Sequence, residues 1–221
     1  MKLLLTSAGV KNPSIHAALV KLLGKPIDEC TALCIPTATY ALPRGPDLAW
    51  QFITGFGSTP MVELGWKSVG VLELTALPSL EREQWIPRVQ ETDVLLVNGG
   101  DPLYLCYWMQ QAGLAELFSS LHDTLYVGLS AGSLVMTPRI GVDFVRWQPP
   151  AGGDETLGMV DFSIFPHLDH EELPDNSMAH AVRWAATMSL PCYAIDDQTA
   201  IQVSGGAVEV VSEGRWKFFT P

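Results

Sequence analysis

Hydrophobic and polar positions follow one another in blocks whose lengths separate strands from helices. Short apolar runs of strand length recur along the chain, at positions 2–6, 31–36, 68–74, 93–100, 125–129 and 192–196. Longer segments carry apolar residues three or four positions apart, which predicts helices at 14–23, 80–89 and 175–188. Ser14 is a candidate N-cap for the first of these helices. Because strands and helices alternate, the pattern predicts an α/β fold with a mostly parallel sheet covered on both faces.

The pattern loosens after position 138. Residues 146–158, with the sequence RWQPPAGGDETLG, are rich in Pro and Gly and predict an exposed loop, which we expect to act as a lid. Residues 199–219 have the pattern of a hairpin with Gly205 and Gly206 at its turn. No repeat or linker divides the chain, so we expect a single domain over residues 1–221.

Composition narrows the classes of function, and a 48% apolar content over 221 residues is enough for a substantial core. The formal net charge of −11, with only 13 Lys and Arg residues, argues against a nucleic-acid-binding surface. No apolar run approaches the roughly 18 residues of a membrane span, and the opening MKLLLTSAG is too short in its apolar part for a signal peptide. We therefore expect a cytoplasmic protein with neither nucleic-acid nor membrane partners. The cysteines lack paired spacing, which predicts buried free thiols at Cys30, Cys34, Cys106 and Cys192.

The stretch GLSAG at 128–132 places a lone hydroxyl, that of Ser130, where a buried strand ends and a helix begins. Ligands and catalytic groups of parallel sheets collect at this end of the strands. The stretch also matches the G-x-S-x-G nucleophile elbow, a sharp turn that exposes the serine and frees the following backbone amides to hold an oxyanion. Ser130 is therefore a candidate nucleophile, and a packing or capping serine is the alternative.

A serine nucleophile needs a base, and five histidines are present. His16 and His180 fall inside predicted helices, and His122 falls at a helix end. His167 follows a short apolar strand through Pro166, which places it in a strand-end loop suited to face the elbow. His167 is the candidate base, and a surface loop histidine is the alternative.

The segment HLDHEE at 167–172 raises a second kind of site. Histidines and carboxylates can ligate a metal ion, so a metal-dependent hydrolase using His167 and His170 is a rival interpretation. The spacing lacks the regularity of H-E-x-x-H, and no distant cluster of Cys or His completes it. We therefore predict no metal site.

The sequence NGGDP at 98–102 follows another predicted strand. Paired glycines let the backbone approach a ligand closely, and the N–H of Gly100 could donate to an oxyanion. Asp101 and Pro102 also have the chemistry of a helix N-cap and a first helical residue. The two interpretations are compatible with each other.

Four segments together carry a family resemblance. VNGGDPLYL, GLSAGS, PHLDH and AIDDQTAIQV occur in an order similar to that of the S51 family of serine peptidases, which contains aspartyl dipeptidase and cyanophycinase. The resemblance runs from the opening KLLLTS to the final hairpin. It implies a three-layer αβα sandwich related to class I glutamine amidotransferases, with serine in place of the cysteine nucleophile of those enzymes.

The resemblance also implies roles for individual residues. Ser130 matches the family's nucleophile, and His167 matches its base. Gly100 and Ala131 fall where the family places its oxyanion-hole amides.

The acid of the triad has two candidates under this resemblance. Asp197, in IDDQTA, corresponds to the acid of cyanophycinase. Asp143 is the carboxylate nearest to the position that aspartyl dipeptidase uses. We favour Asp197 because it falls at the position of the cyanophycinase acid itself, whereas Asp143 only lies near the corresponding position of aspartyl dipeptidase.

The substrate is less well defined by these motifs. Aspartyl dipeptidase cleaves after an N-terminal aspartate, and an arginine is the natural partner for that carboxylate. Arg139 and Arg146, shortly after the elbow, are candidate substrate-binding residues together with Asp101, and Arg183 is a further cation. Each arginine also has an interpretation as a solvated surface charge. PHLDHEE departs from the aspartyl dipeptidase pattern, and the arginines that follow the histidine in cyanophycinase are absent, so the preferred residue stays open.

We therefore expect a serine peptidase that hydrolyses short peptides, with Asp-X dipeptides as one candidate class, and without a metal or organic cofactor. A catalytically silent protein of the same fold that binds a small molecule or peptide is the main alternative. The resemblance is compatible with a homodimer.

Overall fold

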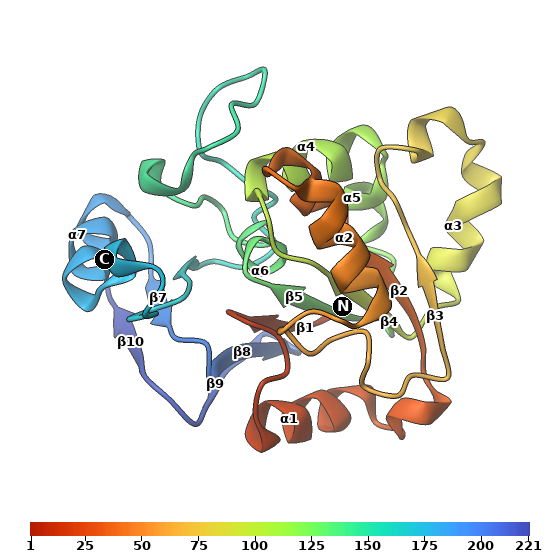
Figure 1. Cartoon of the computed structure of the whole chain (residues 1–221), viewed down its shortest axis with the longest axis horizontal. Coiled ribbons are helices and arrows are strands. Elements are labelled where there is room, and N and C mark those ends of the chain that lie inside the picture. Colours follow the sequence, from red (N-terminus) through yellow and green to blue (C-terminus); the bar gives the residue numbers. More distant parts are fainter.

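The centre of the molecule is a seven-stranded sheet with the strand order β3-β2-β4-β5-β1-β8-β9, seen in this computed structural model of residues 1–221 (Figure 1). Its strands are β1 (Lys2–Thr6), β2 (Thr31–Ile35), β3 (Ser68–Val71), β4 (Val94–Val97), β5 (Leu125–Leu129), β8 (Thr199–Ser204) and β9 (Ala207–Ser212). The five strands from β3 to β1 run parallel, whereas β8 and β9 pair antiparallel at the other edge. The predicted mostly parallel sheet is confirmed.

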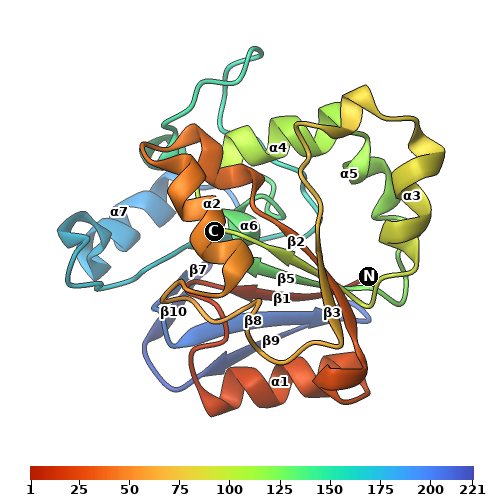
Figure 2. The same ribbon diagram turned by 45° about the vertical axis from the view of Figure 1, so that its right-hand side comes forward.

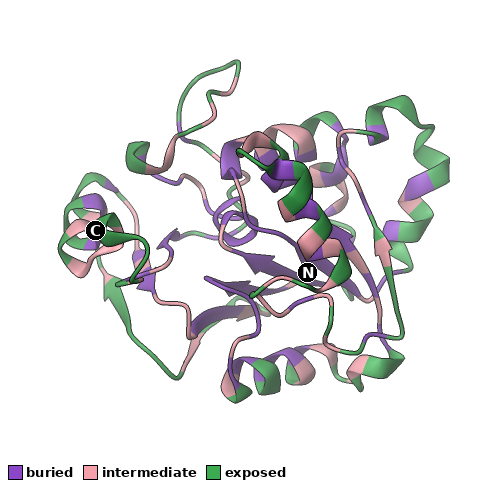
Figure 3. Ribbon diagram, viewed as in Figure 1, coloured by how far each residue is buried: buried purple, intermediate pink, exposed green.

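Helices cover both faces of this sheet (Figure 2). The helices of the chain are α1 (Pro13–Leu23), α2 (Gly45–Thr54), α3 (Arg82–Gln90), α4 (Pro102–Gln111), α5 (Leu114–Leu117), α6 (Ala131–Leu134) and α7 (Met178–Thr187). All but α7 lie against the central sheet, whereas α7 packs on a second sheet described below. Successive side chains of a strand point to opposite faces, so Leu3 and Leu5 join the core beneath α3 to α6, whereas Leu4 joins the core against α1. Figure 3 shows the central strands of the sheet as buried, between helices whose outer sides are exposed. The layered αβα arrangement is confirmed.

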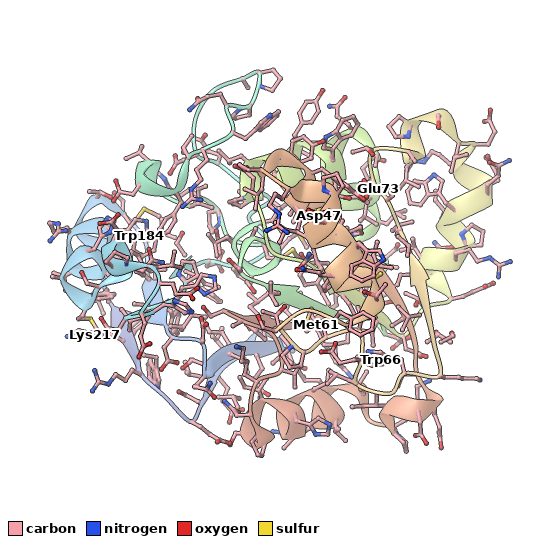
Figure 4. All side chains as sticks on the ribbon, viewed as in Figure 1. Asp47, Met61, Trp66, Glu73, Trp184 and Lys217 are labelled. Atoms are coloured by element: carbon pink, nitrogen blue, oxygen red, sulfur yellow. The ribbon has the colours of Figure 1, made fainter.

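The core on the α1 side is closed by the segment that follows α2. Met61 and Trp66, labelled in Figure 4, are buried there, and the indole Nε1 of Trp66 donates to the carbonyl oxygen of Met61 at 2.7 Å. The four cysteines are free and buried, as the absence of paired spacing predicts.

A second, three-stranded sheet lies beside the first and was not expected. Its strands, in the order β10-β7-β6, are β10 (Trp216–Phe219), β7 (Cys192–Ile195) and β6 (Ser163–Phe165). Helix α7 packs on it through Trp184, whose indole lies against Phe144 and Phe165 and is labelled in Figure 4. The predicted hairpin at 199–219 is therefore correct only for β8 and β9, because β10 leaves that hairpin and pairs with β7.

Element ends differ from the predictions where a local contact decides them. The N-cap of α1 is Asn12 rather than Ser14, since the Asn12 side chain accepts a hydrogen bond from the backbone of Ile15 at 2.9 Å. The strand predicted at 68–74 ends early because Leu72 and Leu74 turn into the core. No helix combines the length and the apolar character needed to cross a bilayer.

Candidate active site

The candidate site lies where two pairs of parallel strands end. In the central sheet β1 and β5 are neighbours, and Ser7 and Ser130 come directly after them. In the second sheet β6 and β7 are neighbours, and His167 and Asp197 follow closely after them. Because parallel neighbours end at the same edge of a sheet, the topology brings each pair of side chains together.

Ser130 occupies a strained turn between β5 and α6. Its φ of 47° and ψ of −111° lie outside the regions that side-chain-bearing residues favour. The turn requires a small residue after it, since a Cβ on Gly132 would lie 2.3 Å from the carbonyl oxygen of Val97 in β4. The GLSAG stretch therefore has the backbone of a nucleophile elbow, and it presents the serine hydroxyl at the end of the strand.

His167 faces the elbow from the second sheet. Its Nε2 lies 2.9 Å from Oγ of Ser130, and its Nδ1 lies 2.7 Å from Oδ1 of Asp197. An ionised carboxylate only accepts hydrogen bonds, so Nδ1 carries the proton and Nε2 directs its lone pair at the serine hydroxyl. In this tautomer His167 is able to take the proton of Ser130.

Asp197 is held ionised by its neighbours. Burial alone raises the pKa of Asp197, but the hydrogen bond with His167 and the charges of His167 and His170 outweigh it and leave the pKa below its ordinary value. Ser7 adds a hydrogen bond from its Oγ to Oδ1 at 3.2 Å. A carboxylate that stays charged is able to stabilise the imidazolium that forms when His167 accepts a proton.

Two backbone amides are available beside the serine. Gly100 has a φ of 139°, and a Cβ there would lie 2.3 Å from the carbonyl oxygen of Ala38, so only glycine is accommodated. The Gly100 N–H has no acceptor within the chain. Ala131 is the first residue of α6, where backbone amides lack a partner within the helix. These two N–H groups have the character of oxyanion donors.

A cavity of about 240 Å³ opens beside Ser130 and His167. Much of its wall is apolar, with contributions from Leu42, Leu134, Phe144 and Leu173. Arg146 is the only Lys or Arg side chain in the lining, and it forms no ion pair within the chain. The cavity therefore offers one free cation near the serine.

Asp143, the second candidate for the acid, lies elsewhere. Its Oδ2 is 3.0 Å from Nε2 of His180 on α7, so its carboxylate is engaged with a different histidine. Of the two candidates, only Asp197 contacts His167.

Arg139 is also placed differently from the expectation. Its guanidinium forms two hydrogen bonds, of 2.9 and 3.0 Å, with the buried carboxylate of Asp154, and it does not line the cavity. The pair fixes the far end of the 146–158 loop, which rises at the top of Figure 1.

Asp101 borders the cavity but its carboxylate is already occupied. It is the N-cap of α4, where Oδ1 accepts from the backbone amides of Leu103 and Tyr104. Its Oδ2 accepts from the backbone amide of Trp147 at 2.9 Å, which ties the start of the 146–158 loop to α4. Asp101 thus positions the loop that carries Arg146 instead of offering a free oxygen to a substrate.

His167 and His170 do not share a metal-binding arrangement. No group of three or more His, Cys, Asp or Glu side chains has the geometry to hold a metal ion. The two rings contact the same carboxylate instead, with Nε2 of His170 lying 3.5 Å from Oδ2 of Asp197.

Sequence reasoning missed Ser7. The signal was present, because Ser7 follows the strand that the α/β pattern places at the centre of the sheet, and the rule that singled out Ser130 applies equally to it. His170 was considered only as a metal ligand, since its proximity to Asp197 depends on how the loop after β6 folds back.

Comparison with known proteins finds similarity to peptidases. The family model described as peptidase family S51 matches residues 3–211. Peptidase E of Streptomyces coelicolor is 35% identical over 100 residues, which are 43% of this chain and 39% of that protein. An uncharacterized peptidase of Listeria monocytogenes is 24% identical over 127 residues, which are 55% of this chain and 61% of that protein. The matches thus span between about two fifths and three fifths of the curated relatives' length.

Solved structures show the same fold. A candidate peptidase E protein from Listeria monocytogenes EGD-e superposes with a TM-score of 0.67 at 19% identity, covering 96% of this chain and 98% of the other. A peptidase from an acI-B1 actinobacterium gives a TM-score of 0.61 at 20% identity, covering 99% of this chain and 93% of the other.

Proposed function

Because this chain belongs to peptidase family S51, we propose that it is a serine peptidase of short peptides, with Ser130 as nucleophile, His167 as base and Asp197 as acid. One observation carries the proposal: the hydrogen-bonded series from Asp197 through His167 to Oγ of Ser130, with distances of 2.7 and 2.9 Å. The strained serine backbone supports the same reading, because it occurs at a strand end that faces a cavity.

The first half of the reaction forms an acyl-enzyme. His167 Nε2 accepts the proton of Ser130 as Oγ attacks the scissile carbonyl carbon, and the carbonyl oxygen becomes an oxyanion. The amides of Gly100 and Ala131 hold that oxyanion. The C–N bond then breaks, and His167 returns its proton to the leaving amine. In the second half, water loses a proton to His167 and attacks the acyl carbon. The bond between that carbon and Oγ then breaks, and His167 returns the proton to Oγ, which restores Ser130 and releases the carboxylic acid product.

The size of the cavity favours short substrates. Pockets for drug-sized ligands usually measure at least about 300 Å³, so 240 Å³ accommodates little more than a few residues. The loop at 146–158 is fixed at both ends by Asp101 and Asp154, which limits how far it can open.

Arg146 is the group that we assign to recognition of a substrate carboxylate. It is the cation in the cavity lining, and a guanidinium matches a carboxylate with two parallel hydrogen bonds. The partner is either an acidic side chain, as in an Asp-X dipeptide, or the peptide's own C-terminal carboxylate.

Hydrolysis of a panel of dipeptides and tripeptides tests the activity. Wild type should cleave at least one peptide, Ser130→Ala should cleave none, and Ser120→Ala, which removes an exposed hydroxyl, should match wild type. A fluorophosphonate should label wild type and Ser120→Ala but not Ser130→Ala, because only an activated serine reacts readily. Absence of both cleavage and labelling in wild type would refute the peptidase and favour a silent binding protein.

A second comparison tests the role of Arg146. Arg146→Leu should raise KM for Asp-X peptides by about tenfold or more, whereas Arg183→Leu, which removes an exposed arginine on α7, should not. Peptides with an amidated C-terminus distinguish the two candidate carboxylates. If Arg146 binds the C-terminal carboxylate, the difference in KM between wild type and Arg146→Leu should disappear with amidated peptides. If Arg146 binds an acidic side chain, the difference should remain.

A further inference from the structure

Two side chains outside the proposed triad contact Asp197, one on each oxygen. Ser7 lies on Oδ1, the oxygen that also faces His167, and His170 lies on Oδ2. They come from different parts of the fold, since Ser7 follows β1 in the central sheet and His170 lies in the loop after β6. Asp197 is thus contacted from both sheets.

Ser7 connects the acid to the backbone of the base. Its Oγ accepts a hydrogen bond from the backbone N–H of His167 at 2.7 Å and donates to Oδ1 of Asp197 at 3.2 Å. The residue is completely buried. His167 has a φ of 53°, so its backbone is in the left-handed region, and the hydrogen bond from its N–H helps to hold it there.

The tautomer of His170 follows from its second contact. Its Nδ1 accepts a hydrogen bond from the backbone N–H of Glu172 at 3.1 Å, so Nδ1 is unprotonated and the hydrogen of the neutral ring is on Nε2. That nitrogen is the one that lies 3.5 Å from Oδ2 of Asp197. The contact is long for a hydrogen bond, and catalytic contacts of this kind commonly shorten when substrate binds.

We propose that Ser7 and His170 are positioning residues that hold Asp197 from both sides and so keep His167 protonated on Nδ1. The proposal rests on the proposed serine peptidase mechanism and assigns to it two residues that act through the acid. A carboxylate free to rotate about its side-chain bonds would lose its contact with Nδ1 for part of the time. His167 would then populate the Nε2–H tautomer, which cannot accept the proton of Ser130.

The surroundings of His170 explain why a donor is needed on that side. Asp197 and His170 border a second, open cavity of about 650 Å³, which is also lined by Asp169, Glu171, Glu172 and Asp196 and by one cation, Arg215. Asp197 is partly exposed, so solvent has access to it from this cavity, and the four other carboxyl groups of the lining outnumber its one guanidinium. In the proposed arrangement Nε2 of His170, 3.5 Å from Oδ2, supplies the donor for the oxygen that faces this cavity.

Kinetics of matched variants give the first test. His170→Phe keeps the volume of a ring but removes the donor, and kcat should fall by about tenfold or more with KM unchanged. His170→Gln places an amide N–H near the position of Nε2 and should recover most of kcat. His16→Phe, which makes the same change at an exposed histidine of α1, should leave both constants unchanged. Ser7→Ala should lower kcat in the same way as His170→Phe.

NMR of ¹⁵N-labelled histidine rings gives the second test, and it needs no turnover. In wild type we expect His167 as the Nδ1–H tautomer, and in Ser7→Ala and His170→Phe a larger share of Nε2–H. His170→Gln should retain the wild-type tautomer. A merely structural loss would lower the unfolding temperature without a specific change of tautomer.

The outcomes separate the two proposals. Unchanged tautomer and unchanged kcat in either removal variant overturn the positioning role of that residue and leave the peptidase intact. If wild type cleaves no peptide but Ser7→Ala and His170→Phe still change the tautomer of His167, the peptidase is refuted and the positioning role of Ser7 and His170 is retained.

Discussion

At the scale of single residues, contacts decide which of several similar groups is able to act. Two aspartates were candidates for the acid, and each contacts a histidine: Asp197 contacts His167, and Asp143 contacts His180. Only the first histidine also reaches Ser130. Sequence spacing could not separate these pairs completely, because both depend on how the chain folds back after the elbow.

Replacement of the two aspartates tests this distinction. If the proposed triad is correct, Asp197→Asn should reduce kcat by roughly 10⁴-fold, because an amide at this position stabilises the wrong histidine tautomer, as the same change does in a Ser-His-Asp triad. Asp143→Asn is the matched control and should keep kcat within about twofold. Equal losses in the two variants would contradict the assignment of the acid.

The lowered pKa of Asp197 also predicts how stability depends on pH. Since the pKa is lower in the folded than in the unfolded chain, the unfolded state binds more protons at acidic pH. The stabilisation is present above the ordinary Asp pKa of about 3.9 and is lost as pH falls through the lower folded value. The unfolding free energy of wild type, measured with urea, should therefore fall more steeply below about pH 5 than that of Asp197→Asn. Parallel curves for the two proteins would be inconsistent with this linkage.

At the scale of elements, the hydrophobic pattern was most accurate where strands are buried on both faces. The runs at 2–6 and 125–129 match β1 and β5 in both bounds. The pattern failed for β10, because pairing with β7 is a contact between distant segments and leaves no local signal. The α6 helix was predictable, since the elbow motif specifies both the turn and the helix that follows it.

The elbow predicts a specific cost for one added methyl group. Gly132→Ala should lower the unfolding free energy by about 1–3 kcal/mol, because its Cβ would overlap the backbone of β4. Gly57→Ala is the control, since a Cβ there meets nothing closer than 3.7 Å, and its effect should stay within about 0.5 kcal/mol. Urea unfolding of both variants measures the difference, and a Gly132→Ala variant as stable as wild type would mean that the turn relaxes freely.

At the scale of the whole molecule, the site depends on how two sheets face each other. The rule that chemistry collects at the ends of parallel strands identified Ser130 and His167 one at a time. It did not show that β5, which precedes Ser130, and β6, which precedes His167, belong to different sheets. The contact of Ser7 with Asp197 crosses that boundary, and the contact of His170 with Asp197 joins two loops of the second sheet that are distant in the sequence, so no local pattern contained either of them.

The net charge of the molecule acts on every charged substrate. With a formal charge of −11, the protein repels anionic peptides before they reach Arg146, and salt screens that repulsion over about 10 Å at 0.1 M. We expect kcat/KM for an acidic peptide to rise at least about twofold between low and physiological ionic strength. A peptide without net charge should show no such change. A decrease for the acidic peptide would show that local attraction by Arg146 outweighs the long-range field.

The order of the site's segments along the chain determines when the site can form during synthesis on the ribosome. The elbow is made at residue 130, but the acid that orients the base follows at residue 197, and its partner Ser7 lies 190 residues earlier. A ribosome must therefore release the chain to beyond residue 197 before these groups can meet. Until then Ser130 lacks the proposed acid that orients His167, so we expect chains that stop before residue 197 not to react with a fluorophosphonate.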